Sequence, residues 1–555
     1  MMKSKYLRGA IATAVLVAFG GCGGGGNGGN EQQEDEQQEQ VADTIAPGIS
    51  STLPASEEAG VDRFAVITAF FDEDILSSTV ANTSFSLVGN GPVDGTVTFD
   101  SGTNEATFTP DQPLSILTHY TATLGTGITD LAGNALGSEY SWQFTTADGT
   151  LATAADLVHS ETAGLLKPQV IYHDNGDAIA VWSQAADDIQ LWASHFSAGS
   201  GWGAAVQVST GSPLQNFDFS LAADDSGNAL VAWQQLGAGV WVSHYDRDTA
   251  TWGSPVNLND KTTGGGAQVA LDNSGNAIAV WSEGIGMVSD IWASYYTAGI
   301  GWGSPELIEQ GAGFAYGPSL DLDDSGNAIA VWQQDDGSEM SIYANRFVSG
   351  AGWGTAAPLM DGAPESWGAA VAMDDDGNAI AIWIEDNGSR DLWSNRYDAV
   401  DGWGSAVLLE NHSENVGDPQ LAMNDSGTAI VAWAKYNVDT NIGSYASKRF
   451  TPSEGWGPEE TFEYSGFSYY YCDLAIDNSG NALFFWEYDD GNNGTLWMNR
   501  YTADGGWATA TELTSMGDDW GDSSPAVSVK SDGEGMLIFI GGSTTDQQVW
   551  TRLFQ

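Results

Sequence analysis

The stretch Leu271-Asp-Asn-Ser-Gly-Asn-Ala-Ile-Ala-Val-Trp281 decides the fold, because the chain repeats it. Asp224-Asp-Ser-Gly-Asn-Ala-Leu-Val-Ala-Trp233 is a second copy. Five further copies end at tryptophans, and a divergent last copy follows them: Trp182, Trp332, Trp383, Trp433, Trp486 and residues 531–540. A period of roughly 50 residues is typical of arrays and propellers, in which each repeat is one small unit that packs against its neighbours.

Each repeat contains four short stretches with the composition of β-strands. In the copy around Trp281 they are residues 268–271, 276–281, 291–296 and 304–308. The turn Asp272-Asn-Ser-Gly275 joins the first two, since Gly adopts a positive φ easily and Asp and Asn bond to nearby backbone. Gly301-Trp-Gly303 lies in the turn between the last two. Four antiparallel strands in one repeat of this length predict a blade of a β-propeller.

The two ends of the repeat array predict how it closes. The array begins with a lone fourth strand at residues 151–158, which matches residues 507–513 at the end of the seventh repeat. It ends with a lone third strand at residues 549–554. Pairing the two completes a composite last blade and leaves no unpaired edge. We expect an all-β protein with an eight-bladed propeller over residues 151–555; seven blades are the alternative if the last copy is not a blade.

The composition excludes several classes of partner. The 555 residues carry 74 acidic and 16 basic side chains, a formal net charge of −58. A nucleic-acid-binding protein needs a basic surface, and an anionic membrane surface would repel this chain. The acidic surface favours solubility, and some of the acids are candidates for divalent cations. The cysteines are Cys22 and Cys472, so no disulfide framework is expected if Cys22 has another use.

The N-terminus has the features of an export signal. Three basic residues precede an apolar run at residues 9–19, which is too short to span a bilayer. Small residues then precede Cys22. This segment resembles the lipobox of bacterial lipoproteins, in which the cysteine is lipidated, although Phe19 stands in place of the usual leucine. The resemblance implies a signal peptide at residues 1–21 and lipid attachment at Cys22, and ordinary secretion is the alternative.

The segment after the cysteine predicts a tether at residues 22–42. Residues 23–40 are rich first in glycine and then in Glu and Gln, so they are flexible and self-repelling and have no apolar residues for a core. In the lipoprotein resemblance, Gly23 after the cysteine implies export to the outer membrane. The lipid anchor would be the chain's only association with a membrane.

Residues 43–147 contain six short alternating stretches at the spacing of a β-sandwich. Four motifs follow in order: Asp43-Thr-Ile-Ala-Pro47, Phe108-Thr-Pro-Asp-Gln-Pro-Leu114, Ile128-Thr-Asp-Leu-Ala-Gly-Asn134 and Trp142-Gln-Phe-Thr-Thr146. In this order they resemble the bacterial Ig-like domain found in S-layer proteins. The resemblance implies an Ig-like sandwich that serves as a spacer or adhesion module and has no catalytic role.

Four polar residues of this first domain are weak candidates for a Ca²⁺ site. They are Asp72, Glu73, Asp130 and Asn134, and they could meet at one end of the sandwich. Ca²⁺ prefers such oxygen ligands, but Asp and Asn are also common at turns for their backbone hydrogen bonds. We favour turn chemistry there and at the repeated Asp-x-Ser-Gly-Asn turns, so no cofactor is expected.

The loops between repeats hold the candidate ligand site. The loops after the second and fourth strands vary among the copies, and in a propeller both open on one face. Candidate binding residues on them are aromatic or acidic: Phe217, Tyr316, Trp367, Tyr470, Trp520, Asp335, Asp336, Asp489 and Asp490. Aromatic rings beside carboxylates are typical of sugar-binding faces. The alternative is that the rings wedge the blades apart at the channel mouth.

A column of mostly basic residues follows the aromatic residue of each third strand by three positions. It reads His195, His244, Tyr295, Arg346, Arg396, Lys448, Arg500 and Leu553. Ion pairing with neighbouring acids is the expected role, and a ring of arginines for an acidic substrate is the alternative. The repeats also resemble sialidase propellers faintly, but the sialidase Asp-box is absent, so that resemblance assigns no catalytic residue.

The sequence favours a surface-tethered binding or adhesion lipoprotein without enzymatic activity. Its propeller would present a face to a glycan or a cell-surface protein. A glycoside hydrolase or lyase acting on polysaccharide is the first alternative, and a structural protein of the cell envelope is the second. A pair of carboxylates about 5–10 Å apart at the channel mouth would favour the hydrolase.

Overall fold

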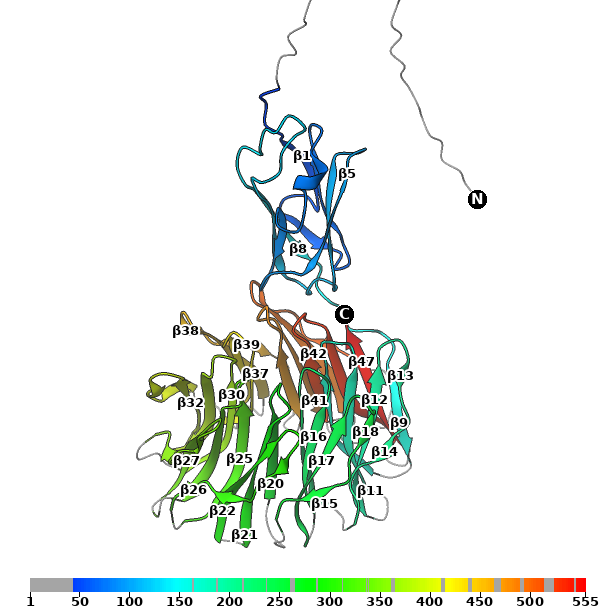
Figure 1. Cartoon of the computed structure of the whole chain (residues 1–555). Helices are drawn as coiled ribbons and strands as arrows, with labels where there is room; N and C mark the ends of the chain where they lie inside the picture. The colour runs from blue at the N-terminus through cyan, green and yellow to red at the C-terminus, as the bar shows by residue number, and fades with distance from the viewer. Residues whose placement is uncertain are drawn as a thin grey trace, which may run out of the picture. The chain divides into compact units, whose positions relative to one another are not determined.

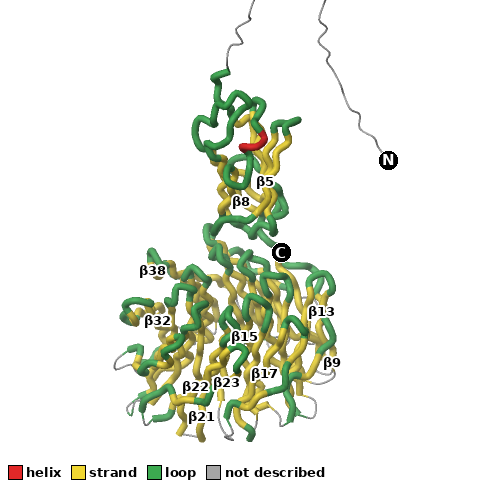
Figure 2. Tube along the Cα trace, viewed as in Figure 1, coloured by secondary structure: helices red, strands yellow, loops and turns green. Residues whose placement is uncertain are grey.

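The structure is a computed structural model. It describes residues 43–161, 164–185, 188–211, 214–235, 237–259, 265–285, 288–311, 313–335, 337, 339–360, 365–410, 415–437, 442–463, 471–489, 494–513, 524–543 and 546–555. Figure 2 shows that this part of the chain is almost entirely strand and loop. Its one helical segment is a short 3₁₀ turn, Ser77–Thr79, and no described helix is long and apolar enough to cross a membrane.

The first domain is a sandwich of two four-stranded sheets, with strand orders β1-β3-β6-β5 and β2-β8-β7-β4. The strands are β1 Ile49–Leu53, β2 Glu58–Val61, β3 Ile67–Phe71, β4 Phe85–Val88, β5 Gly95–Asp100, β6 Glu105–Pro110, β7 His119–Leu124 and β8 Tyr140–Thr146. Their inward residues, including Phe85, Trp142 and Phe144, form one buried core. Sequence patterning missed β1 and β2, because these edge strands are short and mostly exposed.

The repeat array forms eight separate sheets in the described residues, in agreement with one sheet per repeat (Figure 1). The first strands are β10 Gly164–Tyr172, β15 Leu214–Ala223, β20 Gly265–Leu271, β25 Ala315–Leu322, β30 Glu365–Met373, β35 Asn415–Met423, β40 Cys472–Ile476 and β45 Ala526–Val529. The second strands are β11 Ala178–Ala185, β16 Ala229–Gln235, β21 Ala277–Ile285, β26 Ala328–Asp335, β31 Ala379–Asp386, β36 Ala429–Asn437, β41 Ala482–Asp489 and β46 Gly535–Ser543.

The third strands pair with the second ones throughout. They are β12 Ile189–Ser197, β17 Gly239–Asp246, β22 Val288–Thr297, β27 Met340–Val348, β32 Arg390–Asp398, β37 Ile442–Thr451, β42 Gly494–Thr502 and β47 Asp546–Phe554. The fourth strand differs from the expectation, because it is split in two. The Gly-Trp pair is itself the first piece, and a short second piece follows after a break at the next glycine, as in β23 (Gly301–Trp302) and β24 (Glu306–Leu307).

The other outer strands follow the same division. The first pieces are β13 Gly201–Trp202, β18 Thr251–Trp252, β28 Gly352–Trp353, β33 Gly402–Trp403, β38 Gly455–Trp456 and β43 Gly506–Trp507. The second pieces are β14 Val206–Gln207, β19 Val256–Asn257, β29 Ala357–Pro358, β34 Val407–Glu410, β39 Glu460–Glu463 and β44 Thr511–Glu512. The last sheet has β9 (Asp156–Glu161) in this outer position.

Tryptophans at the same place in seven second strands fill the space between sheets. They are Trp182, Trp233, Trp281, Trp332, Trp383, Trp433 and Trp486, each less than 2% exposed. Every buried cluster of the array combines residues of two neighbouring sheets; Trp233, for example, packs with Ile179 and Val181 of the sheet before it. Burying a Trp is worth several kcal/mol, because truncating it to Ala in a core costs about 3–5 kcal/mol.

The first and last sheets are also neighbours. One buried cluster contains Trp182 of the first sheet with Ile538 and Val549 of the last, and Tyr172 N donates to Ser528 Oγ at 3.0 Å. The last sheet is composite, since β9 pairs antiparallel with β47. This outer strand begins at Asp156, later than the expected start at residue 151, and Leu151 makes one isolated bridge to Phe554.

Hydrogen bonds within the repeated turn account for the residues that recur in it. In the turn that starts at Asp272, Oδ1 accepts hydrogen bonds from the backbone N of Ser274 at 2.9 Å and of Asn276 at 2.7 Å. Asn276 Nδ2 donates to Asp272 Oδ2, and Asn276 Oδ1 accepts from Ala298 N in the turn before the outer strand. Gly275 has φ 77°. Both kinds of turn therefore lie at one end of the sheets, which we call the turn end.

The second residues of the eight turns line a polar cavity of about 340 Å³ at the turn end. They are Asp174, Asp225, Asn273, Asp324, Asp375, Asp425, Asn478 and Ser531. Amides separate some of the carboxylates: Asn273 Nδ2 donates to both Asp225 and Asp324. Burial, followed by the carboxylates of Asp425 and Asp324, raises the pKa of Asp375 to about 6.

The column of mostly basic residues differs from the sequence alignment in one repeat. The strand register places Arg449 opposite Ile430, so it replaces Lys448 in the column, whereas Leu553 keeps its place opposite Met536. The expected ion pairing is seen at two members, Arg396 with Asp398 at 3.7 Å and Arg500 with Asp148 at 3.2 Å. Six members also stack on an aromatic ring of the next sheet: His195 on Tyr245, His244 on Tyr296, Tyr295 on Phe347, Arg346 on Tyr397, Arg396 on Phe450 and Arg500 on Phe554.

The outer position of β9 predicts a contrast between two adjacent residues. Val158 is 8% exposed and packs against the last sheet, whereas Leu157 is 46% exposed. Val158→Asp should lower the free energy of unfolding by about 3 kcal/mol or more, because it buries an unpaired carboxylate. Leu157→Asp is the matched control and should cost less than about 1 kcal/mol. Urea unfolding of both variants measures the difference. An equal decrease in the free energy of unfolding in the two variants would show that β9 does not pack on β47 in this orientation.

The polar cavity at the turn end predicts a pH-dependent effect of Asp375→Asn. The pKa of Asp375 in the folded protein is about 6, above its usual value near 4. The carboxyl of the unfolded chain ionises near its usual pKa of about 4, so the fold loses stability as the pH rises from about 4 to about 6 and the loss is complete above pH 6. The variant should therefore raise the melting temperature most at pH 7.5, less at pH 5, and very little near pH 4. Asp376→Asn, one residue further, is the control for loss of charge alone.

Candidate functional site

The first strands carry a bulge near the end opposite the turns, which we call the loop end. The register of β30 against β31 shifts between Trp367 and Ala370. The residue after the aromatic position has a positive φ in most repeats: Lys167 47°, Gly266 61°, Gly317 64°, Gly368 66°, Asp418 44° and Ser524 33°. A bulge of this kind bends the strand and redirects the side chains before it. In the fourth and fifth repeats the aromatic residue, Tyr316 or Trp367, lies directly before the bulge.

A cavity of about 490 Å³ lies at the loop end between the fifth and sixth sheets. It is lined by Trp367, Gly368, Ile384 and Arg390 of the fifth sheet and by Asn415, Val416, Gly417, Asp418, Pro419 and Tyr436 of the sixth. Each of these residues stands next to a loop or a bulge. The volume is in the range of ligand sites, and the mixture of aromatic rings with a few polar groups is typical of them.

Trp367 and Arg390 form the most distinctive pair in this cavity. The guanidinium carbon of Arg390 lies 5.5 Å from the centre of a Trp367 ring, a cation–π contact. No described carboxylate lies within 4 Å of this exposed guanidinium, although the chain has 74 acids. Its N–H groups are therefore available to a ligand. Trp367 is half-buried and also packs against the core between the two sheets.

Tyr316 occupies the same column in the fourth repeat. It is 40% exposed and stacks on Phe314, with ring centres 5.8 Å apart and an interplanar angle of 7°. Tyr316 and Trp367 both lie at the loop end, at equivalent positions beside the bulge. The structure thus places the two described rings of the aromatic column on the same end of the array.

Of the acidic candidates the structure describes the side chain of Asp335, and it also shows a buried carboxyl, Glu385, that was not among them. Asp335 ends β26, and its Oδ1 accepts a hydrogen bond from Gly337 N at 2.8 Å, so it stabilises its own turn. Glu385 is only 4% exposed, and its Oε2 accepts no hydrogen bond from a described residue. Burial, and then the nearby Asp391 carboxylate, raises the pKa of Glu385.

Several candidates lie outside what the structure describes. Tyr470, Trp520, Asp336, Asp490 and Cys22 are outside the described residues. Phe217 and Asp489 lie on β15 and β41, but their side chains are not described. Their roles at the loop end, and the lipid attachment at Cys22, stay predictions.

The weak Ca²⁺ candidates of the first domain have turn functions. Asp72 Oδ1 accepts a hydrogen bond from Gly48 N at 2.7 Å. Asp130 accepts from both the backbone N and the side-chain Nδ2 of Asn134, the same arrangement as in the repeated turns. A carboxylate oxygen of Glu73 lies within 4.8 Å of one of Asp130.

Sequence reasoning missed the bulge and Arg390. The bulge has a signal, because proline follows the left-handed residue as Pro168, Pro318, Pro419 and Pro525. Proline cannot donate to a sheet ladder, and within sheets it is confined to edges and bulges. No sequence pattern pointed to Arg390. It is the first residue of a third strand, and the residue at that position varies among the repeats.

Comparison with known proteins confirms the first domain. Residues 43–146 match the family model described as a bacterial Ig-like domain. Proteins with this kind of domain are typical of bacterial surfaces. No curated protein sequence matches the chain.

Solved structures similar to this chain include enzymes that act on polysaccharides or sialosides. An ulvan lyase of a polysaccharide lyase family is 12% identical and has a TM-score of 0.40, covering 58% of this chain and 89% of its own. A mutant of the NanB sialidase from Streptococcus pneumoniae is 11% identical with a TM-score of 0.35, covering 88% and 83%. The AofleA protein from Arthrobotrys oligospora is 12% identical with a TM-score of 0.34, covering 57% and 90%.

Proposed function

We propose that this chain is a glycan-binding protein of the bacterial cell envelope, built as a closed eight-bladed propeller behind an Ig-like domain. A lipid on Cys22 and a tether at residues 22–42 would hold it to the outer membrane. The loop end would carry the binding site. The observation that carries the proposal is the cavity of about 490 Å³ between the fifth and sixth sheets, with Trp367 and Arg390 in its wall.

The chemistry of the cavity favours a sugar. Aromatic rings pack against the apolar face of a pyranose, and the free N–H groups of Arg390 can donate to its oxygen atoms. Asn415 and the Asp418 carboxylate add polar groups that can bond to hydroxyls. The net charge of −58 repels polyanions at a distance, so neutral glycans are the expected ligands.

The main alternative is a hydrolase or lyase acting on polysaccharide. Its supporting observation is the Glu385 carboxyl, whose raised pKa and neighbouring Asp391 carboxylate resemble an acid paired with a second carboxylate. Glu385 is 4% exposed, however, and does not line the cavity. Product analysis of every glycan that binds distinguishes the two proposals, because a hydrolase would shorten its ligand and Glu385→Gln would stop this.

A glycan array with the chain from residue 23 onward tests binding, and Arg390→Gln tests the site. Losing one hydrogen bond from a charged donor costs about 1.5–3 kcal/mol, so affinity for the best glycan should fall about tenfold or more. The melting temperature should stay the same, because Arg390 is exposed. Arg247→Gln removes an exposed arginine at the turn end and is the matched control. Equal losses from both variants would place the site elsewhere, and an array with no bound glycan would contradict the function.

Tyr316 supplies a second test with a matched ring. Tyr316→Ala should weaken binding of a glycan that extends over the fourth repeat, since its ring is 40% exposed at the loop end. Tyr140→Ala removes a ring of similar exposure, 37%, from the Ig-like domain and should leave binding unchanged. Titration of the same glycan with both variants measures the contrast. If neither variant changes the affinity, the ligand does not reach the fourth repeat.

The anchor is tested separately. Cys22→Ser should move the protein from the membrane fraction to the soluble fraction after cell lysis, because the lipid is the proposed attachment. Mass spectrometry of the wild-type N-terminal peptide should show the lipid on Cys22. An unlipidated wild-type protein would overturn this part of the proposal and leave the glycan site untouched.

A further inference from the structure

In the turn of the last repeat, the pair formed by the first and last residues differs in charge from the same pair in the other repeats. The other turns begin with Asp, Asn or His and end with Asn, Asp or Thr, whereas the last one reads Lys530-Ser-Asp-Gly-Glu534. Lys530 Nζ donates to Glu534 Oε2 at 2.7 Å, so a cation and a carboxylate replace the usual carboxylate and amide. The turn keeps its shape, since Gly533 has φ 89° and its N donates to Lys530 O at 3.0 Å. Lys530 Nζ also donates to Asp532 Oδ2 at 3.2 Å, and both carboxylates accept hydrogen bonds from a second cation.

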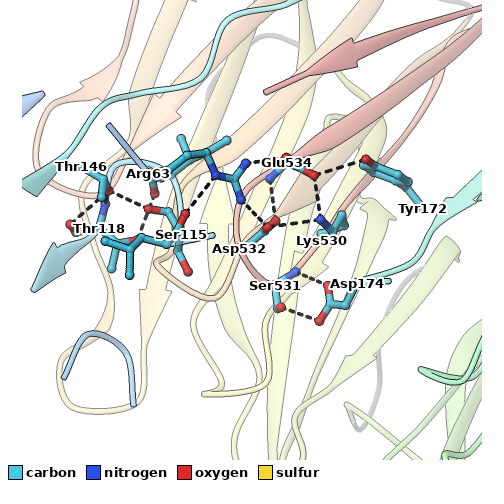
Figure 3. A network of polar contacts seen from close by, with 12 residues as sticks. Arg63, Ser115, Thr118, Thr146, Tyr172, Asp174, Lys530, Ser531, Asp532 and Glu534 are labelled. Carbon is cyan, nitrogen blue, oxygen red and sulfur yellow. Dashed lines mark hydrogen bonds and ion pairs between the residues drawn. The ribbon is translucent and has the colours of Figure 1, made fainter. Parts of the chain in front are cut away.

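That cation is Arg63 of the Ig-like domain. Its Nη1 lies 2.5 Å from Glu534 Oε1 and its Nη2 lies 2.6 Å from Asp532 Oδ2, while its Nε donates to Leu114 O at 3.1 Å. Figure 3 shows the guanidinium pointing at both carboxylates. The Arg63 side chain is 11% exposed. Such a planar, two-pronged contact fixes orientation as well as proximity.

Apolar contacts accompany the ion pairs. Ile116 of the Ig-like domain is 2% exposed and belongs to the buried cluster of the seventh and eighth sheets, with Phe485, Leu537 and Phe539. Its N donates to Asp532 O at 2.7 Å. A side chain at Gly533 would meet Ile116 Cβ at 3.2 Å, so the turn has room for Ile116 only because that residue is glycine.

The same turn is bonded to the first sheet of the array. Ser531 Oγ donates to Asp174 Oδ2 at 2.5 Å, and Ser531 N donates to Asp174 Oδ1 at 3.0 Å. Tyr172 Oη donates to Glu534 Oε2 at 3.2 Å. Figure 3 shows that these contacts and those of Arg63 form one network. The turn therefore stands where the Ig-like domain, the last sheet and the first sheet meet.

We propose that the Ig-like domain is a clasp on the seam between the first and last sheets of the propeller, and that the last turn is its docking site. The divergent sequence of the last repeat is an adaptation to this docking. The Ig-like domain is then a rigid part of the propeller, whereas a spacer would move freely. Because the clasp holds the turn end, the loop end is directed away from the Ig-like domain.

Hydrogen exchange of the chain from residue 23 onward tests the clasp. Arg63→Met leaves two carboxylates without their buried partner, and a broken buried ion pair is strongly destabilising. Exchange of the backbone amides in β10 and in β45–β47 should become about tenfold faster or more, because local opening then requires less free energy. Amides of β21 and β26, on the far side of the array, should keep their rates.

Two further variants keep the test decisive. Arg63→Lys retains the charge without the planar fork and should speed exchange at the seam by a smaller factor. Lys167→Met removes the exposed ion pair of Lys167 with Asp218 on β10, which contributes little, and should leave the seam unchanged. Unaltered exchange at the seam in Arg63→Met would overturn the proposal. So would faster exchange spread evenly over all eight sheets, which would indicate general destabilisation.

Discussion

Each sheet of the repeat array depends on its neighbours to bury its two faces. The Trp in the middle of the second strand lies between two sheets, and each buried cluster of the array joins residues of two adjacent repeats. A single sheet of this size cannot bury both faces alone, so stability comes from stacking and every repeat needs a partner on either side. This requirement places the first repeat beside the last one, and it makes that seam the point where the chain must supply additional contacts.

The two ends of the stack have different chemistry for a physical reason. At the turn end the backbone is satisfied by the side chains of Asp and Asn within each turn, so the sequence there is constrained and repeats. At the loop end a bulge interrupts the register of six first strands, and the sequence around it differs among the repeats. A ligand site needs such freedom on a rigid frame. The cavity with Trp367 and Arg390 lies at that end.

The acidic composition leaves this chain with few cations, and the structure shows how they are used. Arg346, Arg396 and Arg500 stack on aromatic rings between sheets, and Arg63 joins the Ig-like domain to the last repeat. Arg390 differs from these, since it is exposed in a cavity wall and stacks on Trp367 within its own sheet.

The sequence by itself determined what depends on local pattern. The period of the repeats, the turns made by Asp, Gly and Asn, the inward tryptophans and the motifs of the Ig-like domain can all be read along the chain, because each follows from residues close together in sequence. The tertiary structure decided what depends on register and long-range contact. In the sixth repeat the strand register is shifted by one residue, so Arg449 takes the place in the basic column that the sequence pattern assigned to Lys448. A bulge in the first strand positions the aromatic residue of the fifth repeat. The partners of Arg63 lie more than 460 residues away along the chain. No local pattern carries these facts, because side chains from distant strands meet only once the sheets have packed.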